Sequence, residues 1–257
     1  MSCMNEKNTQ PLGEYSKLYE LTDGLDKKRI SKPEIDLEAM YRSDLKLKEM
    51  LKDTSDDCAE ELLAGFTAIE HYPKTVTFFG SARTKPGAAF YELARDLAGE
   101  ICKEGYAVIT GGGPGIMEAA NRGTKETCGY AVGFNIELPT EQVINEYVTH
   151  GINFKFFSAR KMAMFFSGEA FLFFPGGFGT LDELFQLLTL IQTHKAPNTP
   201  VILVGAEYWN NLDKFIKNTL LDEFETISKD DLNLYTISDD KEEIMNIIRN
   251  APLRSAY

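Results

Sequence analysis

Residues 170–183 read AFLFFPGGFGTLDE and join an apolar run, a glycine-rich loop and the start of a helix. The run Ala170–Phe174 contains no polar side chain, which is typical of a strand covered on both faces. Two further apolar runs lead into loops that contain glycine, Gly80–Arg83 and Gly111–Gly115. We therefore expect parallel strands whose carboxyl ends carry these loops.

The same alternation continues on both sides of this stretch, with short apolar runs followed by longer segments of helical spacing. The expected strands are Thr75–Gly80, Tyr106–Thr110, Tyr130–Ile136, a short extended stretch near Tyr147, Ala170–Phe174, Pro200–Val204 and Leu234–Ile237. The expected helices are Ala88–Lys103, Ile116–Thr127, Ser158–Ser167, Thr180–Thr193, Tyr208–Phe224 and Asp239–Asn250. This order predicts an α/β fold with a doubly wound parallel sheet, Rossmann-like, and helices on both faces.

Upstream of this alternation, apolar residues recur at helical spacing in two segments, Glu34–Lys52 and Ser55–His71. We expect two helices there, which form an N-terminal helical extension. Residues 1–33 are polar and contain helix breakers, so we interpret them as a partly ordered arm and assign them no chemistry. The predicted domains are the arm and extension at residues 1–72 and the Rossmann-like domain at residues 73–257.

The chain has 257 residues and a formal net charge of −12, from 27 Lys and Arg against 39 Asp and Glu. This excess of negative charge disfavours general binding to nucleic acid or to anionic membranes. The apolar runs fall well short of the ~18 residues that a membrane-spanning helix needs. Residues 1–11 lack the apolar core of a secretory signal, so we expect a cytoplasmic protein. The cysteines and histidines are scattered, and no metal site is expected.

The three loops Gly80–Arg83, Gly111–Gly115 and Pro175–Thr180 are expected where an open parallel sheet binds its ligands. Glycine lets backbone N–H groups approach a ligand. The helices that follow the loops also present free N–H groups at their N-termini, which favour anions. The loops therefore predict a phosphate site, although a single glycine more often serves a tight turn. A dinucleotide fingerprint is weakened because Ile116 replaces the third glycine of G-x-G-x-x-G, and no P-loop Gly-Lys-Ser/Thr is present.

Glu183 has two interpretations. In Thr180-x-x-Glu183 its carboxylate can complete a capping box, and the spacing alone favours this role. Alternatively, Glu183 lies one helical turn inside the crevice and acts as nucleophile, base or charge stabiliser. Asp182 is interpreted as a partner of the helix dipole.

Basic residues occur near the same loops. Arg160 and Lys161 lie at the start of a helix, where a positive charge opposes the helix dipole unless an anion is near. An anionic ligand would account for them. Arg83 and Arg122 are interpreted as solvated surface charges.

The segment Pro175–Glu183 matches the PGGxGTxxE signature of the LOG (Lonely Guy) family, which the chain resembles over Lys74–Asn250. Gly111–Gly115 and Ser158–Lys161 fit the companion motifs of that family. Its members are cytokinin riboside 5′-monophosphate phosphoribohydrolases, many of which also hydrolyse AMP and carry a misleading lysine decarboxylase label. The N-terminal extension departs from the short members and leaves purine nucleotides open as substrates.

The resemblance implies that Arg160 and Glu183 are the catalytic pair. It implies that the substrate and its phosphate are bound by Gly112, Gly113, Gly115, Lys161, Gly176, Gly177, Gly179 and Thr180. It further implies that Gly80 and Ser81 line the base and ribose region and that Glu118 faces the ligand. In the implied reaction, the bond between base and C1′ stretches toward an oxocarbenium ion, which Glu183 stabilises or attacks. Neither a metal nor an organic cofactor is needed.

Other functions are compatible with this fold. A nucleotide or molybdenum-cofactor carrier would bind without turnover, although a phosphate binder has little use for a carboxylate near the anion. A decarboxylase requires a lysine Schiff base with pyridoxal phosphate, for which Lys161 is a poor candidate. The apolar helix Ser158–Ser167, the extra N-terminal helices and the resemblance together predict a homo-oligomer, either a dimer or an assembly of dimers.

Overall fold

The computed structural model describes residues 37–127, 129–138 and 144–253. The arm at residues 1–33 lies outside them. The chain divides into two compact units between Met50 and Leu51, and the sheet and the three glycine loops belong to the second unit. The domain limit at residue 72 stays a prediction.

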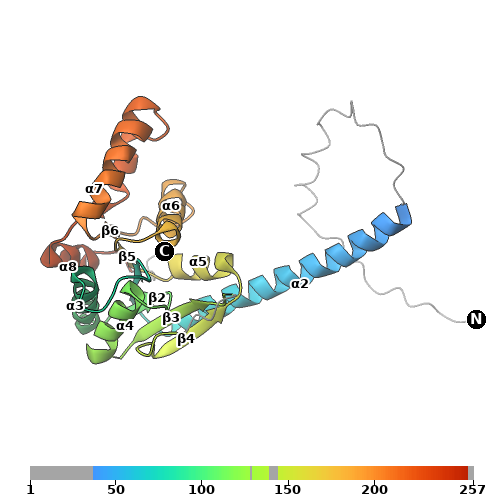
Figure 1. Cartoon of the computed structure of the whole chain (residues 1–257), viewed down its shortest axis with the longest axis horizontal. Coiled ribbons are helices and arrows are strands. Elements are labelled where there is room, and N and C mark those ends of the chain that lie inside the picture. Colours follow the sequence, from blue (N-terminus) through green and yellow to red (C-terminus); the bar gives the residue numbers. More distant parts are fainter. Residues whose placement is uncertain (1–36, 128, 139–143, 254–257) are drawn as a thin grey trace, which may run out of the picture. The chain divides into compact units, whose positions relative to one another are not determined.

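The sheet contains seven parallel strands among the described residues, in the order β4-β3-β2-β1-β5-β6-β7 (Figure 1). The strands are β1 (Thr75–Phe79), β2 (Ala107–Thr110), β3 (Ala131–Ile136), β4 (His150–Phe154), β5 (Ala170–Phe173), β6 (Val201–Leu203) and β7 (Thr236–Ile237). The strand order reverses between β1 and β5, which pair from Val76–Ala170 to Phe79–Phe173. The predicted doubly wound parallel sheet is therefore confirmed.

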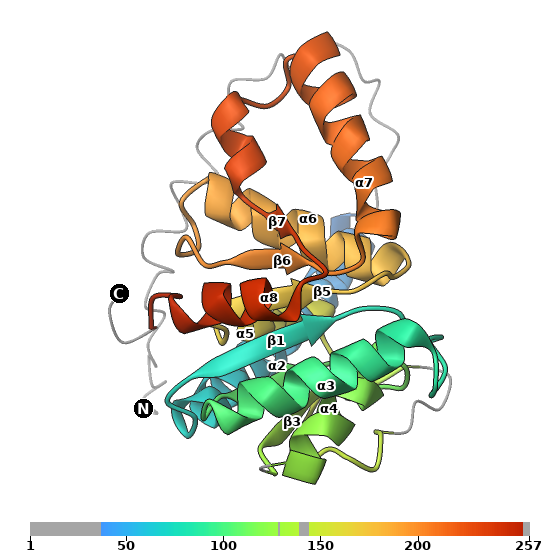
Figure 2. The ribbon, with the colours of Figure 1, turned by 90° about the vertical axis from the view of Figure 1, so that its left-hand side faces the viewer.

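Helices cover both faces of this sheet. The helices of the described residues are α2 (Leu37–Glu70), α3 (Ala89–Lys103), α4 (Ile116–Thr127), α5 (Phe157–Phe165), α6 (Phe178–Gln192), α7 (Ala206–Phe215), the π-helix η1 (Ile216–Glu223), the 3-10 helix η2 (Lys229–Asn233) and α8 (Lys241–Arg249). Successive strand residues point to opposite faces. Phe78 packs in a core with α3, α4 and α8, the face seen in Figure 2, and Phe79 packs in a second core with α5, α6 and α7. No described helix is both long and apolar enough to cross a membrane.

The N-terminal extension differs from the sequence prediction. The two expected helices, Glu34–Lys52 and Ser55–His71, are one helix, α2, over Leu37–Glu70. The gap between the two expected helices, at Asp53 and Thr54, has residues of low helix propensity, but low propensity alone does not end a helix. No glycine or proline stands between residues 34 and 64 to interrupt the helical hydrogen bonds.

Two further elements differ from the prediction. The extended stretch expected near Tyr147 is the strand β4 at His150–Phe154, a largely exposed edge strand without a clear apolar run. The single helix expected at Tyr208–Phe224 is α7 followed by the π-helix η1. Apolar spacing does not reveal a change from i+4 to i+5 hydrogen bonding.

Candidate active site

The candidate site lies at the carboxyl ends of β1 and β5, where the strand order reverses. The loops after these strands are joined, because the Ser81 N–H donates to the Pro175 carbonyl at 3.1 Å. The Ser81 carbonyl accepts from the Ile116 N–H, also at 3.1 Å, at the start of α4. Backbone hydrogen bonds thus hold the three glycine loops together at the switch point.

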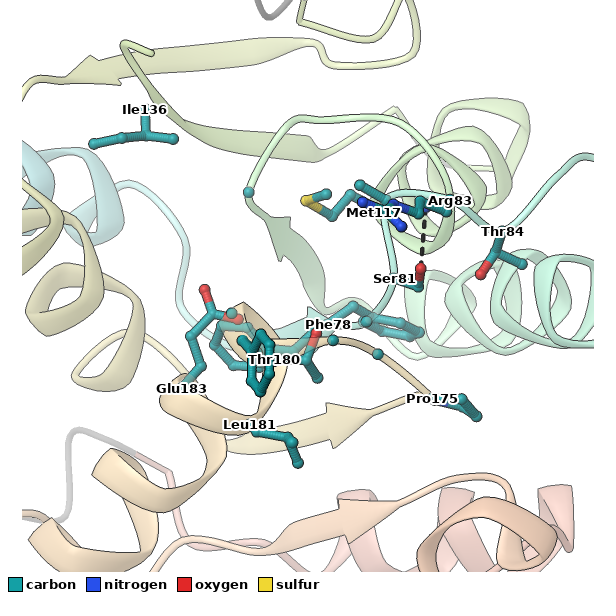
Figure 3. A pocket seen from close by; sticks show the side chains of 18 of the residues that line it. Phe78, Ser81, Arg83, Thr84, Met117, Ile136, Pro175, Thr180, Leu181 and Glu183 are labelled. Carbon is teal, nitrogen blue, oxygen red and sulfur yellow. Dashed lines mark hydrogen bonds between the residues drawn. The ribbon is translucent and has the colours of Figure 1, made fainter. Parts of the chain in front are cut away.

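These loops surround a cavity of about 940 Å³ (Figure 3). Its size is near the upper end of the usual range for small-molecule sites, roughly 300–1,000 Å³. The walls are residues 78–84, Gly111 and Met117, Ile136 and Leu138, Phe157 and Arg160, residues 175–181, and Glu183. The sequence-predicted residues Gly80, Ser81, Arg160, Gly176, Gly177, Gly179, Thr180 and Glu183 are all among them.

Arg160 and Glu183 form a buried pair in this cavity. Arg160 Nη1 lies 3.6 Å from Glu183 Oε1, and the two side chains are 8% and 14% exposed. Arg160 Nε donates to the Phe134 carbonyl at 2.7 Å, which fixes the guanidinium beside β3. A Cβ at Gly111 would overlap this guanidinium, so the glycine leaves room for it. The structure therefore brings together the two residues that the resemblance implies to be catalytic.

Burial sets the protonation of the Glu183 carboxyl. It raises the pKa of Glu183 to about 7, although the positive charge of Arg160 acts in the opposite direction. Burial also lowers the pKa of the Arg160 guanidinium, yet arginine stays charged in proteins at neutral pH. A carboxyl group that titrates near neutral pH is suited to charge stabilisation or proton transfer.

The start of α6 shows that the capping-box interpretation of Glu183 is wrong. The helix begins at Phe178 with Gly177 as its N-cap, and no described side chain caps it. Thr180 therefore lies inside the first turn rather than at the N-cap. The Thr180-x-x-Glu183 spacing matched a capping box, but the glycine loop places the helix start three residues earlier than that box requires.

The loop after β5 is open toward the cavity. A Cβ built on Gly177 or Gly179 would meet no atom within 4 Å. The N–H groups in the first turn of a helix have no carbonyl partner within that helix. Because residues 177–180 line the cavity, these N–H groups can bind an anion there.

The loop after β2 is held by the protein itself. Asn145 Nδ2 donates to the Gly112 and Gly113 carbonyls at 3.0 and 2.9 Å. Gly115 has a φ of 72°, and a Cβ there would overlap the backbone of Ser81 and Ala82. Gly112, Gly113 and Gly115 are not among the cavity walls, and this loop contributes Gly111 alone. Gly112 lies against the backbone of Gly133 as Gly115 lies against that of Ser81 and Ala82, and the substrate-binding role of the three glycines stays a prediction.

Two other residues implied by the resemblance point elsewhere. Glu118 accepts a hydrogen bond from the Tyr91 hydroxyl at 2.7 Å, between α4 and α3. Lys161 Nζ lies 2.8 Å from Asp182 Oδ2. Neither Glu118 nor Lys161 lines the cavity. The resemblance assigns residues by motif position, which does not specify the direction of a side chain.

Several cavity residues were missed from the sequence, among them Arg83, Thr84, Met117, Phe157 and Phe178. Arg83 was interpreted as a solvated charge. Its place in the loop after β1 was the available signal, because that loop was already expected at the ligand crevice. Phe178 carried the same signal, because it stands in the loop Pro175–Thr180. Met117 and Phe157 gave no such signal, since exposed and core apolar residues look alike in a sequence. Phe178 is 94% exposed.

No group of three or more His, Cys, Asp or Glu in the described ranges is placed to hold a metal ion. The site instead combines a helix N-terminus, a buried Arg–Glu pair and a switch-point cavity. These features define a class: doubly wound α/β proteins with a small-molecule cavity at the carboxyl ends of their strands, beside a helix N-terminus that is suited to an anion.

Comparison with known proteins identifies the family. A family described as "Possible lysine decarboxylase" matches residues 117–248. A probable cytokinin riboside 5′-monophosphate phosphoribohydrolase of Oryza sativa subsp. japonica is 30% identical over 159 residues, or 60% of this chain and 73% of that protein. The cytokinin riboside 5′-monophosphate phosphoribohydrolase of Rhodococcoides fascians is 29% identical over 159 residues, or 60% and 79%. The chain belongs to the LOG family, as its motifs predicted.

A solved structure shares the fold. It is the molybdenum cofactor binding protein of the phototrophic bacterium Rippkaea orientalis, with a TM-score of 0.50 and 22% identity. The alignment covers 69% of this chain and 96% of that protein. At this identity the likeness concerns the fold alone.

Proposed function

We propose that the protein hydrolyses the N-glycosidic bond of nucleoside 5′-monophosphates to free base and ribose 5-phosphate. The observation that carries this proposal is the Arg160–Glu183 pair in the same cavity as the N-terminus of α6. The names of the relatives from Oryza sativa and Rhodococcoides fascians support the reaction class. AMP and cytokinin riboside 5′-monophosphates are the proposed substrates.

In the proposed complex, the phosphate binds the N–H groups at the first turn of α6. Gly177 and Gly179 allow this approach because they present no Cβ to the ligand. The phosphate charge is stabilised there by the N–H groups and the helix dipole. Remote binding of the phosphate also orients C1′ of ribose toward Glu183, which lies one turn further along α6.

Hydrolysis then breaks the bond between C1′ and the base nitrogen. Positive charge develops on the ribose ring, and the Glu183 carboxylate stabilises it or attacks C1′. A water oxygen ends on C1′, one of its protons reaches the departing base, and the other remains on the new hydroxyl group. Arg160 orients the ribose phosphate or the base, while its charge holds Glu183 in place.

A single carboxylate is consistent with this scheme. Glu183 is the one acidic residue among the described cavity walls, and the neighbouring Asp182 pairs with Lys161. The mechanism with two carboxylates, which most glycoside hydrolases use, therefore does not fit the described cavity walls. We assign the transition-state charge to Glu183 alone.

The decarboxylase description fits the cavity poorly. Pyridoxal phosphate chemistry needs a lysine at the reacting carbon. No lysine lies among the described cavity walls, and Lys161 is paired with Asp182 outside them. A carrier that binds a nucleotide without turnover is the remaining alternative. Its only support is the fold that the chain shares with the molybdenum cofactor binding protein of Rippkaea orientalis.

The test compares AMP with adenosine, with free base detected by chromatography. The phosphate site predicts that kcat/KM for AMP exceeds that for adenosine by about a hundredfold or more, because adenosine lacks the phosphate and its reaction loses the binding energy of that group relative to free enzyme and substrate. The same assay with a cytokinin riboside 5′-monophosphate gives the base preference. Equal turnover of AMP and adenosine would contradict the proposal.

A further inference from the structure

The two positive charges in the cavity walls differ in whether an acidic residue compensates them. Arg83 and Arg160 are the two basic residues among the described walls. The charge of Arg160 is opposed by Glu183 at 3.6 Å, and its Nε is engaged by the Phe134 carbonyl. Arg83 forms no ion pair with the described part of the chain, although the sequence contains 39 acidic residues. Arg83 is therefore the uncompensated positive side chain of this cavity.

The backbone of Arg83 is held in place while its side chain is exposed. The Arg83 N–H donates to Ser81 Oγ at 3.0 Å, which stabilises a tight turn after β1. The Ser81 N–H is itself bonded to the Pro175 carbonyl in the loop that leads to α6. Two hydrogen bonds thus connect Arg83 to the proposed phosphate site.

Figure 3 shows how Arg83 lies in the cavity. In this view Arg83 and Met117 are at one side of the cavity, and Glu183 is at the opposite side. In a nucleoside 5′-monophosphate, the phosphate and the glycosidic bond are likewise separated, because the ribose ring lies between them. In the proposed complex the glycosidic bond is near Glu183, so the phosphate extends away from the Glu183 carboxylate, toward the side of Arg83.

We propose that Arg83 is a second phosphate-binding residue, which binds the phosphate together with the N-terminus of α6 and makes the site specific for phosphorylated ligands. The guanidinium presents paired N–H donors that match two phosphate oxygens, whereas a base or ribose offers no such pair of charged acceptors. The nucleotide identity of this ligand rests on the proposed function, but the phosphate recognition does not.

The role of Arg83 separates binding from chemistry. Arg83 touches the phosphate and not the reacting atoms. Its loss therefore weakens the binding of the substrate and of the transition state equally. Such a loss raises KM and leaves kcat unchanged. Loss of a residue at C1′ would instead lower kcat.

The test compares Arg83→Met with Lys85→Met. Lys85 is exposed and stands two residues further along the same loop, but it does not line the cavity. Both substitutions change the net charge equally. Arg83→Lys is the third variant, because it keeps the charge and loses the paired geometry. Melting temperatures verify that each variant is folded.

The probes are inorganic phosphate, whose dissociation constant is measured by calorimetry, and AMP in steady-state turnover. Arg83→Met is expected to weaken phosphate binding and to raise KM for AMP, each about tenfold, with kcat unchanged. Arg83→Lys is expected to fall between Arg83→Met and the original protein, and Lys85→Met to match the original protein.

Two results would overturn this inference. One is an Arg83→Met protein that binds phosphate as well as the Lys85→Met protein does. The other is a fall in kcat at unchanged KM. The calorimetric result does not depend on turnover, so it decides the role of Arg83 even when AMP is not cleaved. Failure of the proposed function and failure of this inference are therefore distinguishable.

Discussion

The loops after β2 and β5 are both rich in glycine, and the sequence assigned both to the ligand. In the structure they differ. Gly177 and Gly179 after β5 border open space in the cavity, whereas Gly115 after β2 lies against the backbone of Ser81 and Ala82. Asn145 donates to two carbonyls of the β2 loop, and the Gly112 N–H donates to Thr110 Oγ1 at 2.9 Å within the protein.

This difference shows that a high glycine content identifies a loop, but does not tell whether a ligand or another part of the protein packs against that loop. A glycine permits the close approach of a ligand or of another part of the protein. At Gly115 the neighbour is the loop after β1, and at Gly177 and Gly179 the space is free. The two loops therefore differ in role: the β2 loop packs against the loop after β1, and the β5 loop is the one that we propose binds the ligand.

Gly115→Ala tests the packing role of the β2 loop and should have the largest effect. Its φ of 72° disfavours alanine, and the new methyl group would overlap the backbone of Ser81 and Ala82. The free energy of unfolding should fall by about 2–5 kcal/mol, measured by denaturant titration.

Gly179→Ala is the matched change in the β5 loop. Gly179 is helical, has no positive φ and borders free space, so alanine should raise the free energy of unfolding by up to about 1 kcal/mol. Equal losses of stability in the two variants would show that the loops do not differ as described.

Glu183→Gln and Glu118→Gln compare the carboxylates that follow the two loops. Loss of the Glu183 charge should lower kcat for AMP by about a hundredfold or more, since the developing ribose charge is no longer stabilised. Glu118 bonds Tyr91 outside the cavity, so its variant should keep its activity. A Glu183→Gln protein with near-original kcat, while folded, would remove the carboxylate from the mechanism.

The pH dependence of kcat/KM should show the titration of Glu183. Its pKa is raised to about 7, so the carboxylate becomes protonated as the pH falls through 7. At pH 6 the kcat/KM for AMP should be about a tenth of its value on the alkaline plateau. The Glu118→Gln variant should follow the same profile. A flat profile from pH 6 to 8 would contradict a need for ionised Glu183.

Lys161→Ala should have the smallest effect. Lys161 pairs with Asp182, whose side chain is 59% exposed, and the pair lies outside the cavity walls. The variant should lose at most about 1 kcal/mol of stability and keep kcat/KM for AMP within about twofold. A tenfold rise in KM would return Lys161 to the substrate site that the resemblance assigned to it.

The sequence predicted the sheet and the switch-point loops because buried parallel strands such as Ala170–Phe173 are apolar throughout. It did not predict the continuity of α2 or the π-helix η1, because both depend on hydrogen bonding that apolar spacing does not report. It placed Arg160 and Glu183 by motif. The directions of Glu118, Lys161 and Arg83 are decided by tertiary neighbours, which a motif does not contain.

The most direct test of the central claim is a product analysis of AMP incubated with the original protein over many turnovers. Hydrolysis at C1′ predicts free adenine and ribose 5-phosphate in equal amounts, with no inorganic phosphate released. Recovery of intact AMP from a protein that binds it would favour a carrier. Adenosine and inorganic phosphate as products would contradict the account, because they require cleavage at phosphorus and not at the carbon facing Glu183.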